Sequence, residues 1–137
     1  MTQPLKIMVI DDDATTLDVV SAILEKQGHQ VMQRSQALGT TRAIIRDKPD
    51  VVLLDVHMPG LSGDKLAGLI AAEVGARPLV ILLSGSPRAE LELLVLTSRA
   101  DGFIEKSGDP AEFVRRFDGV IAARYAGRST PRSGRRG

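Results

Sequence analysis

Hydrophobic residues along the chain follow two patterns that alternate five times. Short continuous apolar runs, typical of strands buried on both faces, are each followed by a segment in which apolar residues recur at helical spacing. The predicted strands are residues 5–10, 30–34, 51–56, 79–84 and 102–105. The predicted helices are residues 15–26, 38–46, 66–73, 88–98 and 111–124. This alternation predicts an α/β fold, a doubly wound five-stranded parallel sheet with five helices.

Local signals indicate where several of these elements begin and end. Asp13 precedes the first helix, where a carboxylate both caps the free N–H groups and suits the helix dipole. Gly28 ends that helix, and Pro49 stops the second helix. The segment 30–34 is less apolar than the other strands and is therefore expected at an edge of the sheet. His29, in the turn before it, is expected at the surface.

Composition narrows the kind of core and the compartment. The chain has 137 residues, of which 43% are hydrophobic, enough for one domain with a buried core. Aromatic residues make up 3% and tryptophan is absent, so the core is aliphatic, which favours layered helices and sheet. Without cysteine there is no disulfide and no thiolate zinc site. No apolar run approaches the ~18 residues of a membrane span, and the start lacks a signal peptide, so we expect a soluble cytoplasmic protein.

Basic residues gather at the C-terminal end of the chain. The net charge is +1, yet residues 128–137 hold four arginines and no acid, so the remainder is net negative. Because this segment is rich in Gly, Ser, Pro and Arg, we expect one folded domain at residues 1–126 and a disordered basic tail at 127–137. The tail is either an electrostatic arm that binds nucleic acid weakly, a membrane or an acidic partner, or else a solubilising end or a remnant linker. The second interpretation is favoured, because charged runs are common and no aromatic residues are interleaved.

Acidic residues follow two of the predicted strands. Asp11, Asp12 and Asp13 stand directly after the first strand, and Asp55 closes the apolar run 51–54. Because the carboxyl ends of parallel strands meet at one edge, these carboxylates are expected to share a small pocket. Like charges that close repel one another unless a cation lies among them. Mg²⁺ prefers such oxygen ligands together with phosphate oxygens, so the cluster suits phosphoryl chemistry.

Two further polar residues are expected at the same edge. Ser84 ends the fourth predicted strand and Lys106 follows the fifth. A metal ion, a lysine and a hydroxyl around one carboxylate are sufficient for in-line phosphoryl transfer, with Asp55 as the nucleophile. Taken alone, Asp55 would be interpreted as an ordinary carboxylate that caps a loop. The presence of Asp12, Ser84 and Lys106 at the neighbouring strand ends favours the functional interpretation instead.

Four short motifs carry a family resemblance. They are VIDD at 9–12, LLDVHMPG at 53–60, LSG at 83–85 and FIEK at 103–106. In order and spacing they resemble the receiver domains of bacterial two-component response regulators, over residues 5–124. The resemblance implies a flavodoxin-like fold with strand order 2-1-3-4-5. It also implies a signalling switch in a phosphorelay, here a stand-alone, chemotaxis-regulator-like receiver, because residues 125–137 are too few for a DNA-binding domain.

The resemblance assigns metal and acceptor roles. Asp55 would accept a phosphoryl group from a sensor histidine kinase or a phosphotransfer protein. Asp12 would bind Mg²⁺, or alternatively Mn²⁺, directly, and Asp11 would assist through water. The backbone carbonyl of His57 would complete the protein ligands together with Asp55. The His57 side chain itself is expected in a solvent-facing loop rather than on a softer metal.

The remaining family positions concern the phosphoryl group and its readout. Ser84 would hydrogen-bond one phosphoryl oxygen, Lys106 would pair with another, and Phe103 would change rotamer on activation. A downstream protein would bind the surface formed by the fourth helix, fifth strand and fifth helix. In the fourth helix, Leu93 or Leu96 is expected to face outward as a partner contact. Whether the chain forms a homodimer is left open. Ser107 follows Lys106 where the family commonly has a proline with a cis peptide, so the isomer of this bond is left open.

Three other classes of protein remain open beside this hypothesis. A haloacid-dehalogenase-like phosphatase needs a second acid two residues after the nucleophile, where this chain has His57. A flavodoxin-like cofactor binder needs a loop that accepts phosphate after the first strand, and the acidic run there would repel it. A degenerate receiver that only binds proteins is the main alternative. We therefore expect that the protein is not an enzyme, and that its only reactions are self-phosphorylation from a phosphodonor and autodephosphorylation.

Overall fold

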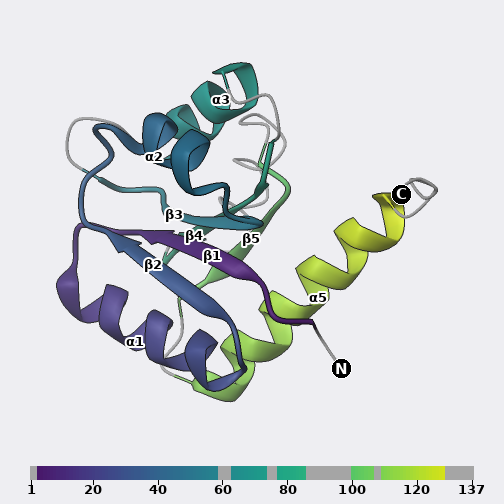
Figure 1. The fold of residues 1–137 in the computed structure, drawn as a ribbon. Helices are drawn as coiled ribbons and strands as arrows, with labels where there is room; N and C mark the ends of the chain where they lie inside the picture. The colour runs from purple at the N-terminus through teal and green to yellow at the C-terminus, as the bar shows by residue number, and fades with distance from the viewer. Residues whose placement is uncertain (1–2, 59–62, 74–76, 86–99, 107–108, 129–137) are drawn as a thin grey trace.

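The computed structural model describes residues 3–58, 63–73, 77–85, 100–106 and 109–128. Its centre is one five-stranded sheet in the order β2-β1-β3-β4-β5, with all neighbouring strands parallel (Figure 1). The strands are β1 (Lys6–Ile10), β2 (Gln30–Arg34), β3 (Val51–Asp55), β4 (Leu79–Ser84) and β5 (Gly102–Glu105). The predicted sheet, its strand order and the edge position of β2 are therefore confirmed.

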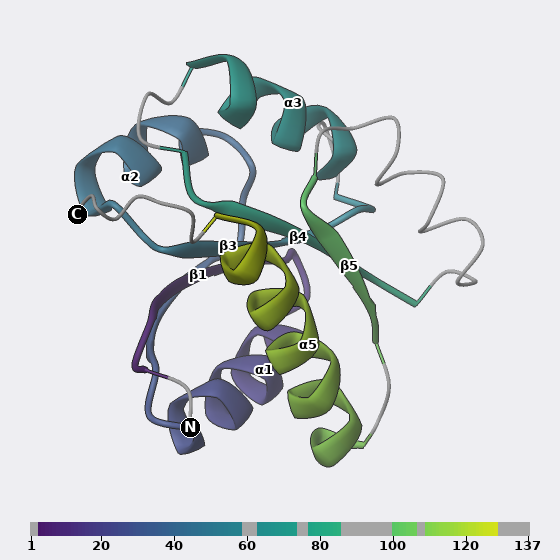
Figure 2. The ribbon, with the colours of Figure 1, turned by 90° about the vertical axis from the view of Figure 1, so that its right-hand side faces the viewer.

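Helices cover both faces of the sheet. They are α1 (Ala14–Lys26), α2 (Thr40–Asp47), α3 (Gly63–Glu73) and α5 (Pro110–Arg128). Figures 1 and 2 show α1 and α5 on one face and α2 and α3 on the other. The fourth predicted helix, residues 88–98, lies outside the described residues. Within the part of the chain that the structure describes, no helix is long and apolar enough to cross a membrane.

The core consists of two apolar layers divided by the sheet. Strand β3 is buried along its whole length and supplies both layers by alternation. Val52 and Leu54 pack toward α2 and α3, while Val51 and Leu53 pack toward α1 and α5. Each such side chain contributes roughly 1.5–3 kcal/mol when fully buried. This rigid centre fixes where the strands end, and therefore where the polar residues that follow them lie.

Several helix boundaries differ from the expectation. Helix α2 begins at Thr40 rather than at residue 38, because Gly39 takes a positive φ of 81° and turns the chain into the helix. The first helix is capped as predicted, with the Asp13 carboxylate accepting a hydrogen bond from the Thr16 N–H. Helix α3 starts earlier than expected, at Gly63. Helix α5 continues to Arg128, past residue 124 and into the segment assigned to the tail.

The expectation for His29 was wrong. Its side chain is buried, with 6% exposed, rather than at the surface. The imidazole lies edge-on against Phe117 of α5, with ring centroids 5.6 Å apart. Helix α5 therefore covers a turn residue that local sequence patterns place in solvent.

Candidate functional site

The predicted carboxylates converge at the carboxyl edge of the sheet. Strands β1 and β3 are neighbours, with Ile10 opposite Leu54, so the residues that end them lie side by side. One carboxylate oxygen from each of Asp11, Asp12 and Asp55 lies within 4.8 Å of the others. Asp11 and Asp55 are buried, whereas Asp12 is exposed. The cluster is thus half enclosed and open to solvent on the side of Asp12.

Lys106 is the positive counterpart of this cluster. Its Nζ lies 2.9 Å from Asp11 Oδ2 and 3.5 Å from Asp55 Oδ1. The backbone N–H of Lys106 donates to the Ser84 carbonyl at 2.7 Å, which continues the β4–β5 pairing by one residue. The lysine is therefore positioned by the sheet, and its ammonium group bridges two of the three carboxylates.

Backbone groups orient the buried carboxylates. Asp11 Oδ1 accepts the N–H of Asp13 at 2.9 Å, and the Asp11 N–H donates to the Arg34 carbonyl at 3.1 Å. Asp55 Oδ1 accepts the N–H of His57 at 3.3 Å. Each of these carboxylates is thus held by the loop that follows it, which keeps its second oxygen available to the cluster.

The local electrostatics are those of crowded like charges. Burial raises the pKa of Asp55 and the Asp11 and Asp12 carboxylates raise it further; Lys106 and the His57 N–H oppose them without cancelling the rise. Burial lowers the pKa of Lys106, but its contacts with Asp11 and Asp55 prevail and raise it overall. The surroundings of Lys106 therefore favour its charged form, whereas those of Asp55 oppose negative charge.

The donor set fits a hard divalent cation. Asp11 Oδ2 is buried and receives no hydrogen bond of good geometry within the described residues; its close partner is the ammonium of Lys106, in an ion pair. A buried anionic oxygen beside two further carboxylates is the arrangement that Mg²⁺ or Mn²⁺ stabilises. Asp11, Asp12 and Asp55 could hold such an ion.

The other predicted site residues lie at or near the same edge. Ser84 is the last residue of β4 and is 1% exposed, one position beyond Leu83, which pairs with Asp55. The His57 side chain is exposed, as expected. Phe103 of β5 is partly buried and packs against the core layer under α2 and α3. The 106–107 peptide bond and the expected outward leucines of the fourth helix lie outside the described residues.

A hollow next to Asp12 was not foreseen. It has a volume of about 290 Å³ and lies between the β2–α2 loop and the segment after β3. Its lining residues are Asp12, Ser35, Gln36, Ala37, Leu38 and Met58. The helical spacing of apolar residues predicts that Leu38 lies inside a helix. Gly39, directly after it, is the signal that could have indicated a loop there instead.

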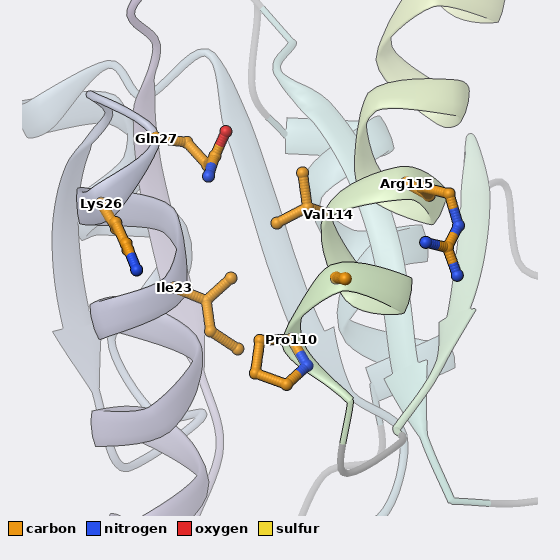
Figure 3. Close-up of a pocket in the computed structure, with 7 residues that line it drawn as sticks. Ile23, Lys26, Gln27, Pro110, Val114 and Arg115 are labelled. Carbon is orange, nitrogen blue, oxygen red and sulfur yellow. The ribbon is translucent and has the colours of Figure 1, made fainter.

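A second, larger hollow of about 470 Å³ lies between α1 and α5, away from the carboxylates (Figure 3). The side chains of Ile23, Pro110 and Val114 point into it from the two helices. Lys26 and Arg115 stand at its rim, and Arg115 is paired with Glu112. This apolar surface holds no cluster of reactive groups among its lining residues.

Comparisons with known proteins place these features in a family. Residues 7–118 match the response regulator receiver domain. PilH of Pseudomonas aeruginosa is 29% identical over 119 residues, covering 85% of this chain and 98% of PilH. The DNA-binding response regulator MtrA of Mycobacterium bovis is 30% identical over 115 residues, covering 84% of this chain and 50% of MtrA. The chain spans only 20% of another relative, the response regulator ARR21 of Arabidopsis thaliana.

Solved structures agree with this assignment. The chemotaxis protein CheY4 of Vibrio cholerae has the same fold, with a TM-score of 0.77 at 18% identity, over 86% of this chain and 99% of that one. The BeF3-activated receiver domain of Klebsiella pneumoniae RstA is 26% identical with a TM-score of 0.74, over 85% of this chain and 97% of that one.

The chain belongs to the response regulator receiver domain family. It is a phosphoacceptor switch of two-component signalling, a class of protein that exchanges phosphoryl groups with histidine kinases or phosphotransfer proteins and acts on downstream targets. The predicted family and function are confirmed at this level.

Proposed function

We propose that Asp55 is the phosphoacceptor of this receiver and that a Mg²⁺ ion is held by Asp11, Asp12, Asp55 and the backbone carbonyl of His57. The observation that carries the proposal is the convergence of three carboxylates within 4.8 Å around a bridging lysine, at the edge where parallel sheets bind ligands. A purely structural carboxylate cluster would gain nothing from this crowding, because it raises the pKa of Asp55.

The positions of the side chains support the following reaction. A carboxylate oxygen of Asp55 attacks the phosphorus of a phosphohistidine, a P–O bond forms, the P–N bond breaks, and the departing imidazole keeps the electron pair and takes a proton from solvent. Bound Mg²⁺ would supply charge neutralisation at the phosphoryl oxygens. Lys106, already 3.5 Å from Asp55, would pair with one of these oxygens, and Ser84 would donate a hydrogen bond to another.

The output of the switch would be a change in partner binding. An aspartyl phosphate adds nearly two negative charges to an edge that is already crowded with carboxylates. Ser84 and Phe103 stand on the adjacent strands β4 and β5, so a movement at the first can be passed to the second. The surface that includes β5 and α5 would present the change to a downstream protein. Exchange with a sensor kinase would place the protein in the cytoplasm.

The direct test is incubation with acetyl phosphate, with and without Mg²⁺, followed by intact-mass measurement. We expect the wild-type chain to gain one phosphoryl group only when the metal is present, and Asp55→Asn to gain none. Asp18→Asn is the matched control, because Asp18 is an exposed carboxylate on α1 outside the cluster, and it should label like the wild type. Labelling of Asp55→Asn at the wild-type rate, or failure of the wild type to label, would contradict the proposal and favour a phosphorylation-independent interaction module.

A further inference from the structure

Leu38 is the most exposed large hydrophobic side chain in the part of the chain that the structure describes. It is 84% exposed, compared with 54% for Ile45 on α2 and 51% for Val19 on α1. A solvent-exposed leucine does not contribute the roughly 1.5–3 kcal/mol of stabilising free energy that its burial would provide. Single exposed apolar residues are common on protein surfaces, so the position of Leu38 decides whether its exposure has a function.

The loop that carries Leu38 is held in place by Arg34. The guanidinium donates through Nη2 to the Leu38 carbonyl at 2.8 Å and through Nε to Thr40 Oγ1 at 3.3 Å. The Thr40 hydroxyl in turn donates to the Gln36 carbonyl at 3.3 Å. Gly39 is required next to this clamp, because a side chain there would be strained at a φ of +81° and its Cβ would lie 3.3 Å from Arg34 Nη2. Leu38 is therefore presented outward by a preorganised loop, which lowers the entropic cost of binding a partner.

The same loop borders the hollow beside the carboxylate cluster. Leu38 and Ala37 line the 290 Å³ hollow together with Asp12 and Met58. Asp12 belongs to the carboxylate cluster, and Met58 stands three residues after Asp55. The loop is also tied to the cluster by its backbone, because the carbonyl of Arg34 accepts the N–H of Asp11. Asp55 is only 4% exposed, and the hollow that Leu38 lines adjoins Asp12, the exposed carboxylate of the cluster. A protein that presents a phosphoryl group to Asp55 therefore comes within reach of Leu38.

We propose that loop 35–39 is a docking ledge for the phosphodonor protein, and that Leu38 contacts the helix that carries the donor's phosphohistidine. The inference rests on the proposed role of Asp55. When the phosphohistidine reaches the carboxylates, side chains about 5.4 Å away, one helical turn along, meet the adjoining hollow. An apolar side chain there buries itself against Ala37, Leu38 and Met58. Leu38 is thus a specificity residue for a protein donor, whereas a small donor such as acetyl phosphate has no part that reaches it.

The test compares two exposed apolar residues with two kinds of donor. Leu38→Ser removes the ledge, and Ile45→Ser is the matched control, because Ile45 is similarly exposed but does not line the hollow. The protein donor is whichever purified, autophosphorylated histidine kinase from the source organism transfers fastest to the wild type. We expect Leu38→Ser to slow that transfer about tenfold, the equivalent of one lost leucine contact, and to change acetyl phosphate labelling less than twofold. Leu38→Met should restore the transfer rate.

Each other outcome overturns the inference in a recognisable way. Equal kinase transfer to wild type and Leu38→Ser excludes the ledge, and equal slowing with both donors assigns Leu38 to the reaction site itself. A loss in Ile45→Ser as large as in Leu38→Ser assigns the effect to the general apolarity of this face. A lower oligomeric mass of Leu38→Ser with unchanged transfer shows that a second copy of the chain covers the loop. Acetyl phosphate labelling without transfer from any kinase excludes a protein donor, whereas absence of both contradicts the proposed role of Asp55.

Discussion

The sheet has an amino edge, where its parallel strands begin, and a carboxyl edge, where they end. Polar side chains have opposite roles at these two edges. At the amino edge, three polar residues each stand immediately before a strand and accept the N–H of a residue at, or directly before, the start of the neighbouring strand. The pairs, acceptor first, are His29 with Leu5, Asp50 with Lys6 and Asp101 with Val80, at 3.0, 2.9 and 2.8 Å. At the carboxyl edge, by contrast, the buried Asp11 and Asp55 face each other and depend on one lysine.

The polarity of parallel strands explains this difference. The amino ends of strands leave N–H donors without partners, and carboxylates or imidazole nitrogens satisfy them. The carboxyl ends leave carbonyl oxygens, which cannot donate to a carboxylate. Acidic residues at the amino edge therefore stabilise the fold. Asp11 and Asp55 at the carboxyl edge instead crowd one another and depend on a cation, here the Lys106 ammonium, to offset their charge. The comparison identifies which of the chain's aspartates are structural before any partner is known.

The largest effect is expected from removing a structural aspartate. Asp101 is 3% exposed at its side chain and accepts hydrogen bonds from the Val80 N–H and from Arg77, the latter in a 3.2 Å ion pair. Asp101→Ala leaves a backbone donor and a guanidinium without this acceptor, so the free energy of unfolding should fall by about 3 kcal/mol. Urea unfolding at pH 7 measures the loss.

The control for this prediction is Asp101→Asn, which keeps an acceptor oxygen and should lose less stability. The acetyl phosphate labelling of folded Asp101→Ala should match that of the wild type, since the residue lies at the opposite edge from the carboxylate cluster. A variant that keeps its stability but loses labelling would invert the proposed division between the two edges.

The sequence predicted the carboxyl edge better than the amino edge. Strand order and the residues directly after each apolar run were enough to bring Asp11, Asp12 and Asp55 together. The partner of Asp101 is set by the register between β4 and β5, which the local pattern does not contain. The prediction that His29 lies at the surface was wrong for a related reason, because the Phe117 ring that covers it is distant in the sequence.

The start of α2 shows a different limit. Helical spacing of apolar residues continued through Leu38, so the pattern placed the helix start two residues too early. The positive φ of Gly39 breaks that spacing, and the Arg34 side chain stabilises the break from an adjacent strand. Glycine alone indicated a turn in principle, but the decisive contact is again tertiary. The loop beside the acceptor was missed for this reason.

His29, at the amino edge, should make the free energy of unfolding depend on pH. Burial lowers the pKa of its imidazole below the ordinary 6.5, although Asp118 of α5 opposes the shift. The unfolded chain therefore takes up a proton at a higher pH than the folded one. His29 contributes its full stability above pH 6.5 and loses it as the pH falls toward the folded pKa, by up to about 1.4 kcal/mol per pH unit within that window.

Urea unfolding at a series of pH values between 7 and 5 checks this slope. Nδ1 accepts the Leu5 N–H, so protonation would set two donors against each other in a buried corner beside Phe117. His29→Gln offers an amide oxygen that does not titrate, and its profile should be flatter. Charged groups on the surrounding elements are Lys6 on β1, Glu25 on α1 and Asp118 on α5; Asp118→Asn should extend the window to lower pH. An unchanged slope in His29→Gln would assign the dependence to other groups.

The smallest expected effect is a gain, from removing a charge at the carboxyl edge. Because burial and the Asp11 and Asp12 carboxylates raise the pKa of Asp55, its charge at pH 7 opposes folding. Asp55→Asn keeps the shape, removes that repulsion and gives up one 3.5 Å ion pair with Lys106, for a net gain of roughly 1 kcal/mol in the absence of metal. Adding Mg²⁺ should stabilise the wild type more than the variant, so the difference between their free energies of unfolding should become smaller. If Asp55→Asn were instead less stable without metal, as Asp101→Asn is expected to be, Asp55 would be a structural residue of the same kind and the contrast between the two edges would fail.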